Sequence, residues 1–187
     1  MTYRYAFLTF FMITACSVFL WSTYFLKQQP TLPLVDNIPD AFMEDVVTTI
    51  LDKEGNPKLE ITTPKMVHFS KEDTTRLLTP HLTLYRDSPE PWYITSQYAK
   101  AWQGIENVNF WQDVNIQHAA DEKSPQTTIK TSTLTVHPNQ RTAQTDAPIT
   151  LLQPNMTVNA VGMFADMNSG DIKLLSNTRG EYFPDGE

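Results

Sequence analysis

The chain has 187 residues and a single cysteine, Cys16, so it forms no internal disulfide and must fold through packing and strand pairing. Its formal net charge is −7, and every acidic residue lies after Lys27. This balance argues against a nucleic-acid-binding face and against a polybasic membrane-surface domain. The length suits one domain and a terminal segment.

An uncharged apolar run covers residues 5–26. As a helix it would be about 33 Å long, which matches the hydrocarbon core of a bilayer. Aromatic residues lie near both of its ends, where they favour the membrane interface. We therefore predict a cytoplasmic stub at residues 1–4, a transmembrane helix at residues 5–26, and the rest of the chain on the far side of the membrane.

Two alternatives to an uncleaved span concern processing of this segment. A signal peptide would have a shorter apolar core, and Ser22-Thr23-Tyr24 is a poor cleavage site. A lipoprotein is the second alternative, because Ile13-Thr14-Ala15-Cys16 looks like a lipobox. The apolar run continues after Cys16 where a polar tether is expected, so we favour the span and leave lipidation of Cys16 open.

Residues 27–41 form a predicted linker, because Pro30, Pro33 and Pro39 oppose regular structure. From residue 42 the pattern changes to short segments in which apolar and polar residues alternate, the period-two mark of strands. The clearest predicted strands are 46–51, 82–85, 114–116, 149–151 and 172–175. Turn-forming residues separate them at 54–57, 87–89, 137–139 and 168–170. An all-β sandwich or barrel-like domain is expected over residues 42–184.

A faint repeat begins at Ile61, Ile94, Ile129 and Val158. Each segment starts with a β-branched residue and returns to an apolar or small residue at the sixth position. The repeat predicts a stack of two-strand units whose first and last units expose strands that must be paired or protected. Chance similarity among Thr-rich strands is the alternative.

The chain lacks the patterns of the common catalytic and cofactor sites. There is no G-x-S-x-G, H-E-x-x-H, Walker or G-x-G-x-x-G motif. The four histidines are far apart, without the close spacing of zinc ligands, and are expected at the surface or at strand ends. We therefore expect no catalytic residues, no metal and no cofactor. The histidines are His68, His81, His118 and His137.

The apolar residues of the strands are the remaining candidates for function. They form either a packed core or the lining of a slot between two sheets that takes acyl chains, and the same residue types suit both. On the second interpretation we predict that alternating apolar positions bind lipid. These positions are Val46, Ile50, Leu82, Leu84, Val114, Ile116, Ile149, Leu151, Ile172 and Leu174.

A single span, a proline-containing linker and a Thr-rich repeated β-domain, in this order, resemble the LptC family of the Gram-negative lipopolysaccharide export system. The resemblance covers the whole chain. One departure is Trp111-Gln112-Asp113-Val114, where family members often have a Tyr-Gly-x-Val turn, which leaves the local turn type open. The best local matches are Asp52-Lys-Glu-Gly55, Thr79-Pro80, Pro91-Trp92-Tyr-Ile94 with Ala99, Phe110 with Val114-Asn115-Ile116, and Gly162.

The resemblance implies a twisted β-jellyroll of the OstA-like type whose interior receives the acyl chains of lipopolysaccharide. It implies a single-pass protein of the Gram-negative inner membrane, with most of the chain in the periplasm. It also implies cargo received from the LptB–LptF–LptG ABC transporter and passed to periplasmic LptA, without a covalent step. The alternative function is a membrane-anchored periplasmic scaffold that binds only protein partners.

The last strand, at about residues 171–183, is the predicted docking edge for LptA. Its backbone groups would add a strand from the partner by β-augmentation. By the same logic, the edge near residues 42–51 would face the transporter, which the predicted transmembrane helix would also contact. The residues of the predicted docking edge are Ile172, Lys173, Leu174, Leu175, Ser176 and Tyr182.

Overall fold

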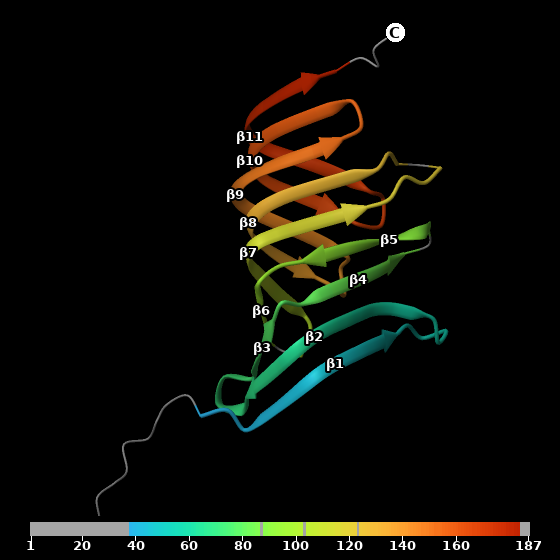
Figure 1. Ribbon diagram of the computed structural model, residues 1–187. Coiled ribbons are helices and arrows are strands. Elements are labelled where there is room, and N and C mark those ends of the chain that lie inside the picture. Colours follow the sequence, from blue (N-terminus) through green and yellow to red (C-terminus); the bar gives the residue numbers. More distant parts are fainter. Residues whose placement is uncertain (1–37, 87, 103, 123, 184–187) are drawn as a thin grey trace, which may run out of the picture. The chain divides into compact units, whose positions relative to one another are not determined.

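Antiparallel strands account for most of the computed structural model, which describes residues 38–183 except residues 87, 103 and 123. The eleven strands form one sheet, in which each strand is hydrogen-bonded to its neighbours (Figure 1), and the predicted all-β class is confirmed. A short 3-10 helix, η1 (Ser70–Glu72), follows the second strand. The strands are β1 (Ala41–Leu51), β2 (Pro57–Phe69), β3 (Thr74–Leu78), β4 (His81–Arg86), β5 (Ser88–Thr95), β6 (Tyr98–Trp102), β7 (Asn107–His118), β8 (Thr127–His137), β9 (Thr142–Gln153), β10 (Met156–Asp166) and β11 (Asp171–Tyr182).

The strands are divided between two walls, because the sheet folds over along a line through the middle of the long strands. The first half of β2 pairs with β4, whereas its second half pairs with β3. Likewise β7 pairs with β6 through its first half and with β5 through its second half. We call the wall that contains β4 and β5 wall A, and the wall that contains β3 and β6 wall B. In Figure 1, the nearer and fainter halves of β7–β11 run in front and behind, which gives the jellyroll-like form.

The fold line, here called the corner, is where the regular pairing breaks. The register of β7 against β8 shifts between Trp111 and Val114, and the register of β10 shifts at Gly162. Backbone in the left-handed region gathers at the same line, and such residues bend and twist a strand. The corner residues with positive φ are Asp45, Thr79, Gln112, Asp113, Gly162 and Asn177. The turn type left open by the sequence is therefore two successive left-handed residues, Gln112 and Asp113.

Each segment of the faint sequence repeat lies where the chain crosses the corner from one wall to the other. The four segments lie in β2, from β5 to β6, in β8 and in β10. The first and sixth residues of a segment would point to opposite faces of an unbroken strand. Because the corner inserts one irregular step, both point inward: Ile129 and Leu134 in β8 are 0% and 1% exposed. The repeat is thus a strand–corner–strand unit.

Threonine hydroxyls donate hydrogen bonds to backbone carbonyls at the corner. The Thr63 hydroxyl donates to Leu78 O at 2.6 Å, and the Thr131 hydroxyl donates to Pro148 O at 3.0 Å. Both threonines are buried. A buried carbonyl without a partner would be destabilising, so these hydroxyls stabilise the bend.

The expected strands and most of the expected turns are observed. The five clearest predicted strands lie within β1, β4, β7, β9 and β11. Ser88 and Pro89, expected in a turn, belong to β5 instead. β1 begins at Ala41, and the predicted span at residues 5–26 lies outside the described residues. Within the described part of the chain, no helix is long and apolar enough to cross a membrane.

Gly162 provides a direct test of the corner. Its φ is +80°, and an added Cβ would lie 2.9 Å from Cδ1 of Leu175 in the neighbouring strand. We expect Gly162→Ala to lower the free energy of unfolding by about 1–2 kcal/mol, because an L-residue is strained in this region. Chemical denaturation followed by circular dichroism measures the change.

Gly180 is the matched control on the partner strand β11. It lies outside the left-handed region, and its added Cβ would make an ordinary 3.7 Å contact with Val158 Cγ2. Gly180→Ala should therefore leave stability nearly unchanged. Equal losses in the two variants would contradict the assignment of Gly162 to a strained corner.

Candidate functional site

A ladder of aliphatic side chains lines the inner face of wall A. It crosses seven strands, because each member lies opposite the next in the strand register. All members are 7% exposed or less, and they belong to one core cluster. Cross-strand pairs of this kind stabilise a sheet and form a continuous apolar surface. The ladder runs Ile61–Leu82–Ile94–Ile116–Ile129–Leu151–Val158.

Wall B faces this ladder with a mixture of large and small side chains. One row joins Leu77, Ala99, Phe110 and Leu134 in register. A second row contains Val108, Val136, Ala143 and Ala165. Side chains of both walls belong to the same core cluster, so the space between the walls is a single apolar interior.

The ten predicted lipid-binding residues all belong to strands that border this interior. Leu82, Leu84, Val114, Ile116, Ile149 and Leu151 are buried in wall A. The other four lie on the two outermost strands, β1 and β11, and are half-buried. Ile50, Ile172 and Leu174 pack against the core. Nine of the ten positions are therefore buried or packed against the core, and Val46 is half-buried outside that cluster. Lipid binding by all ten stays a prediction.

The interior is closed in this structure around its central residues. Leu82, Leu84, Ile116 and Leu134 are each 1% exposed, and Ile94 is not exposed at all. A space large enough to hold an acyl chain beside them would leave them accessible. The walls must therefore separate before a chain can lie along the ladder.

A buried polar pair lies at the end of wall A. His118, the last residue of β7, places Nε2 3.5 Å from Oδ2 of Asp121, and the two side chains are 0% and 3% exposed. The Trp92 ring lies against the imidazole, with 4.8 Å between the ring centroids. His118 is a strand-end residue, as expected, but its side chain is buried. The pair holds the β7–β8 loop against the interior.

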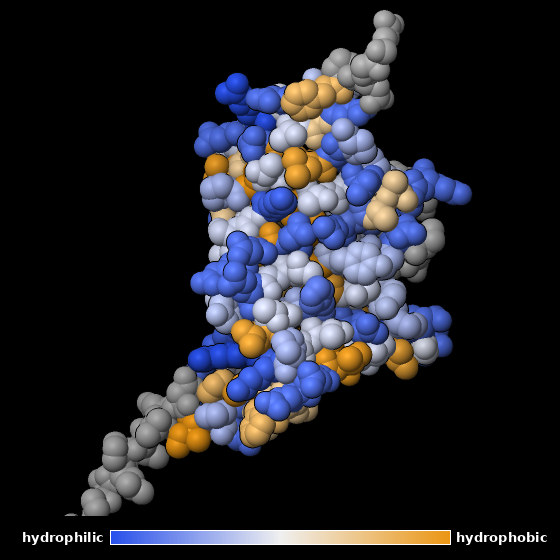
Figure 2. Space-filling model, viewed as in Figure 1, coloured by the Kyte–Doolittle hydropathy of each residue, from blue (hydrophilic) through white to orange (hydrophobic). Residues whose placement is uncertain are grey.

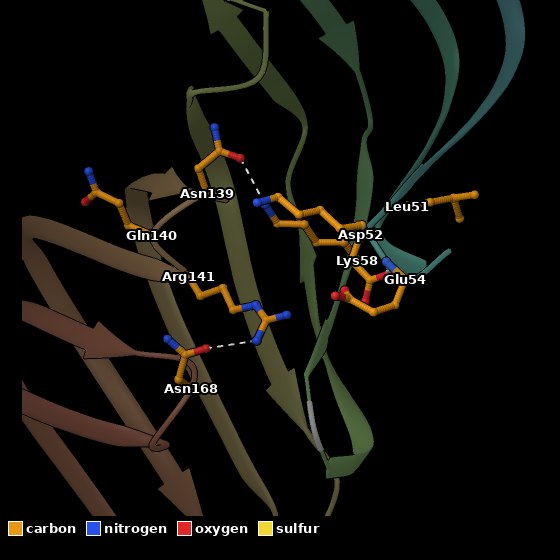
Figure 3. Close-up of a pocket in the computed structure, with 9 residues that line it drawn as sticks. Leu51, Asp52, Glu54, Lys58, Asn139, Gln140, Arg141 and Asn168 are labelled. Atoms are coloured by element: carbon orange, nitrogen blue, oxygen red, sulfur yellow. Dashed lines mark hydrogen bonds between the residues drawn. The ribbon is translucent and has the colours of Figure 1, made fainter. Parts of the chain in front are cut away.

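A pocket lies at the seam, the line opposite the corner where turns of the two walls meet. Its volume is about 500 Å³, and Figure 3 shows its side chains converging from the β1–β2 turn, the β8–β9 turn and the β10–β11 turn. The Lys58 ammonium donates to Asn139 Oδ1 at 3.0 Å and so links the start of β2 to the β8–β9 turn. The Arg141 guanidinium donates to Asn168 Oδ1 at 3.1 Å. The lining residues are Leu51, Asp52, Lys53, Glu54, Lys58, Asn139, Gln140, Arg141 and Asn168.

The Asp52 carboxylate is held by its own turn. Oδ1 accepts the backbone N–H groups of Glu54 at 3.0 Å and of Asn56 at 2.8 Å. The backbone hydrogen bond from Asn56 is the main reason why the pKa of Asp52 is lower than that of an ordinary aspartate. Asp52 is therefore ionised at neutral pH and fixed in the turn.

The sequence did not reveal the pocket. Lys58 and Asn139 are 81 positions apart, and no motif links them. Polar residues are common in turns and give no signal by themselves. The pocket residues can be recognised only once the sheet has folded at the corner and brought the two turns together at the seam. Within the described residues, no group of three or more His, Cys, Asp or Glu side chains is placed to hold a metal ion.

The predicted docking edge lies on β11, at one end of the sheet. β11 pairs with β10, and β1, at the other end, pairs with β2. In β11, Ile172 and Leu174 point inward while Lys173 and Leu175 are exposed. The Ser176 hydroxyl donates to Val161 O at 2.9 Å, and Tyr182 is 70% exposed. Figure 2 shows hydrophobic surface towards the first and last strands and a largely hydrophilic face between them.

Comparison with known proteins agrees with this architecture. Among solved structures, the crystal structure of LptH, the LptA homologous periplasmic component of the conserved lipopolysaccharide transport device from Pseudomonas aeruginosa, matches with a TM-score of 0.54 and 10% sequence identity. The match covers 67% of this chain and 95% of that chain, and it confirms the jellyroll-like fold. A search of curated proteins found no match. A family model described as "Lipopolysaccharide-assembly, LptC-related" matches residues 7–183. The chain therefore belongs to the LptC-related family of lipopolysaccharide-assembly proteins.

Proposed function

We propose that the chain carries lipopolysaccharide from the LptB–LptF–LptG transporter of the inner membrane to periplasmic LptA, with the acyl chains held between its two walls. The observation that carries this proposal is the continuous aliphatic ladder, which crosses seven strands and leads towards an outermost strand at each end of the sheet. Membership of the LptC-related family supports lipopolysaccharide as the cargo. No covalent step is needed.

Transfer requires the walls to open, because the central ladder residues are inaccessible. The acyl chains replace the contacts that each wall makes with the other, so the apolar surface stays out of water. The half-buried inward residues of β1 and β11, such as Ile50 and Leu174, are the places where a chain first reaches the interior. In this proposal the cargo enters past β1 and leaves past β11.

The outermost strands provide the contacts with partners. β11 offers backbone donors and acceptors to LptA, β1 offers its edge to the transporter, and the predicted span at residues 5–26 holds the domain at the membrane. Strand addition at a free edge is an established mode of protein recognition. The exposed Leu175 and Tyr182 beside this edge, 58% and 70% exposed, add apolar surface for the partner.

A scaffold that binds only proteins is the second candidate function, and the closed interior favours it. Such a protein would use the edges of β1 and β11 without opening its walls. The two candidates differ in one observable property, which is whether lipid reaches the inward side chains.

Neighbouring residues of β11 allow a controlled labelling test. Leu174 points inward and Lys173 points outward. With a photo-reactive residue at position 174, we expect cross-links to lipopolysaccharide in cells, and with one at position 173 we expect few. The measurement is immunoblotting for lipopolysaccharide on the purified chain. Absence of lipid at position 174, in a chain that still supports growth, would leave the scaffold as the function.

Proline substitutions test the docking edge. Adjacent amides of a strand point to opposite sides, so one of Lys173→Pro and Leu174→Pro removes a donor to β10 and the other removes a donor at the outer edge. We expect the substitution that removes a donor to β10 to lower thermal stability. The substitution that removes a donor at the outer edge should weaken recovery of LptA in a pull-down while stability is nearly kept.

Truncation after Gly170 removes the whole edge and should abolish LptA recovery. Circular dichroism must first show that the truncated chain keeps its β-structure. Equal recovery of LptA by the folded truncated chain and by the full chain would falsify docking at β11.

A further inference from the structure

The seam pocket places charged side chains directly beside the apolar interior. Lys58 precedes Leu59, which is not exposed at all, and Asn168 follows Met167, which is 2% exposed. Both apolar residues belong to the core cluster. A molecule with an ionic head and hydrocarbon chains therefore meets matching surfaces on the two sides of this boundary.

The pocket has cations whose charge is not neutralised by the contacts that they make. Lys58 and Arg141 each donate to a neutral amide oxygen, on Asn139 and Asn168 respectively. Neither forms an ion pair with a carboxylate among the described residues. Lys53 also lines the pocket. The head of a ligand that fits here is therefore an anion.

The acidic side chains of the pocket do not remove this preference. Asp52 is bonded to the backbone of its own turn, as its contacts with Glu54 and Asn56 show. Glu54 is exposed at the rim, in the same turn. Three cations and two carboxylates line the pocket, and one of the carboxylates is already engaged by backbone donors. In Figure 3 the Lys58 and Arg141 side chains extend into the space between the turns.

We propose that the seam pocket binds phosphate groups on the head of the lipid cargo, with Lys58 and Arg141 as the principal donors. This inference rests on the proposed function and adds a head-group site to it. A guanidinium offers paired N–H donors that suit phosphate oxygens, and an ammonium adds a point charge. A volume of about 500 Å³ accommodates a phosphorylated sugar. The acyl chains then extend past Leu59 into the opened interior.

The test compares two lipid preparations on the full chain in detergent. One is intact lipopolysaccharide, and the other is the same material after phosphatase treatment. We expect wild-type protein to bind intact lipid at least about tenfold more tightly, because charge-assisted hydrogen bonds are lost on dephosphorylation. In the double variant Lys58→Met with Arg141→Met, the two affinities should become equal. Lys130→Met, which removes an exposed cation of β8 away from the pocket, should keep the wild-type preference.

Inorganic phosphate serves as the second probe and separates a lipid head from a free anion. Competition by phosphate against intact lipid, lost in the double variant, supports the head-group site. Equal affinity of the wild-type chain for both lipid preparations overturns the inference while the proposed function stands. Binding of phosphate alone, with no binding of either lipid, overturns both the head-group assignment and the proposed function.

Discussion

The bend of the sheet at the corner is the constraint on which the rest of the structure depends. A flat sheet of these strands would expose its apolar face to water, and the bend turns the two halves of that face towards each other. The bend requires backbone that ordinary strands avoid, as at Gln112, Asp113 and Gly162. Thr63 and Thr131 then bond carbonyls at the fold line. The interior, the seam and the two outermost strands all follow from this arrangement.

The closed interior determines the free-energy cost of separating the two walls, which any transport of lipid between them requires. Each fully buried Leu or Ile contributes about 1.5–3 kcal/mol, and the interior contains many such side chains. A hydrogen bond from a charged group, such as that between Lys58 and Asn139, contributes about 1.5–3 kcal/mol at most, and the seam has few of them. The apolar contacts therefore hold the walls together more strongly than the polar ties at the seam. Opening into water would be far too costly, while opening around hydrocarbon exchanges one apolar contact for another. In the proposed function, opening and loading must accordingly occur together.

Much of this architecture could be predicted from the sequence, because its signal is local. Alternation at Leu82 and Leu84, or at Ile149 and Leu151, identified strands and their inward faces. In the sequence, the corner appeared only as a faint repeat. The repeat arises from an irregular step in the backbone of each long strand, which requires no shared sequence motif. The seam pocket could not be predicted, because the Lys58–Asn139 contact depends on how the two walls face each other. The burial of His118 depends in the same way on Trp92 and Asp121.

The central claim is that the walls separate to admit lipid, and locking them together tests it most directly. Cysteines at positions 58 and 139, in a chain with Cys16→Ala, can be joined by a short bifunctional thiol reagent across the seam. A cleavable reagent allows the lock to be removed. The matched control is the same double-cysteine chain treated with a monofunctional reagent of similar size, which alters the pocket equally without joining the walls. Lipopolysaccharide that binds this control should fail to bind the locked chain and should bind again after cleavage. Equal binding before and after locking would contradict the account, because the cargo would then need no separation of the walls.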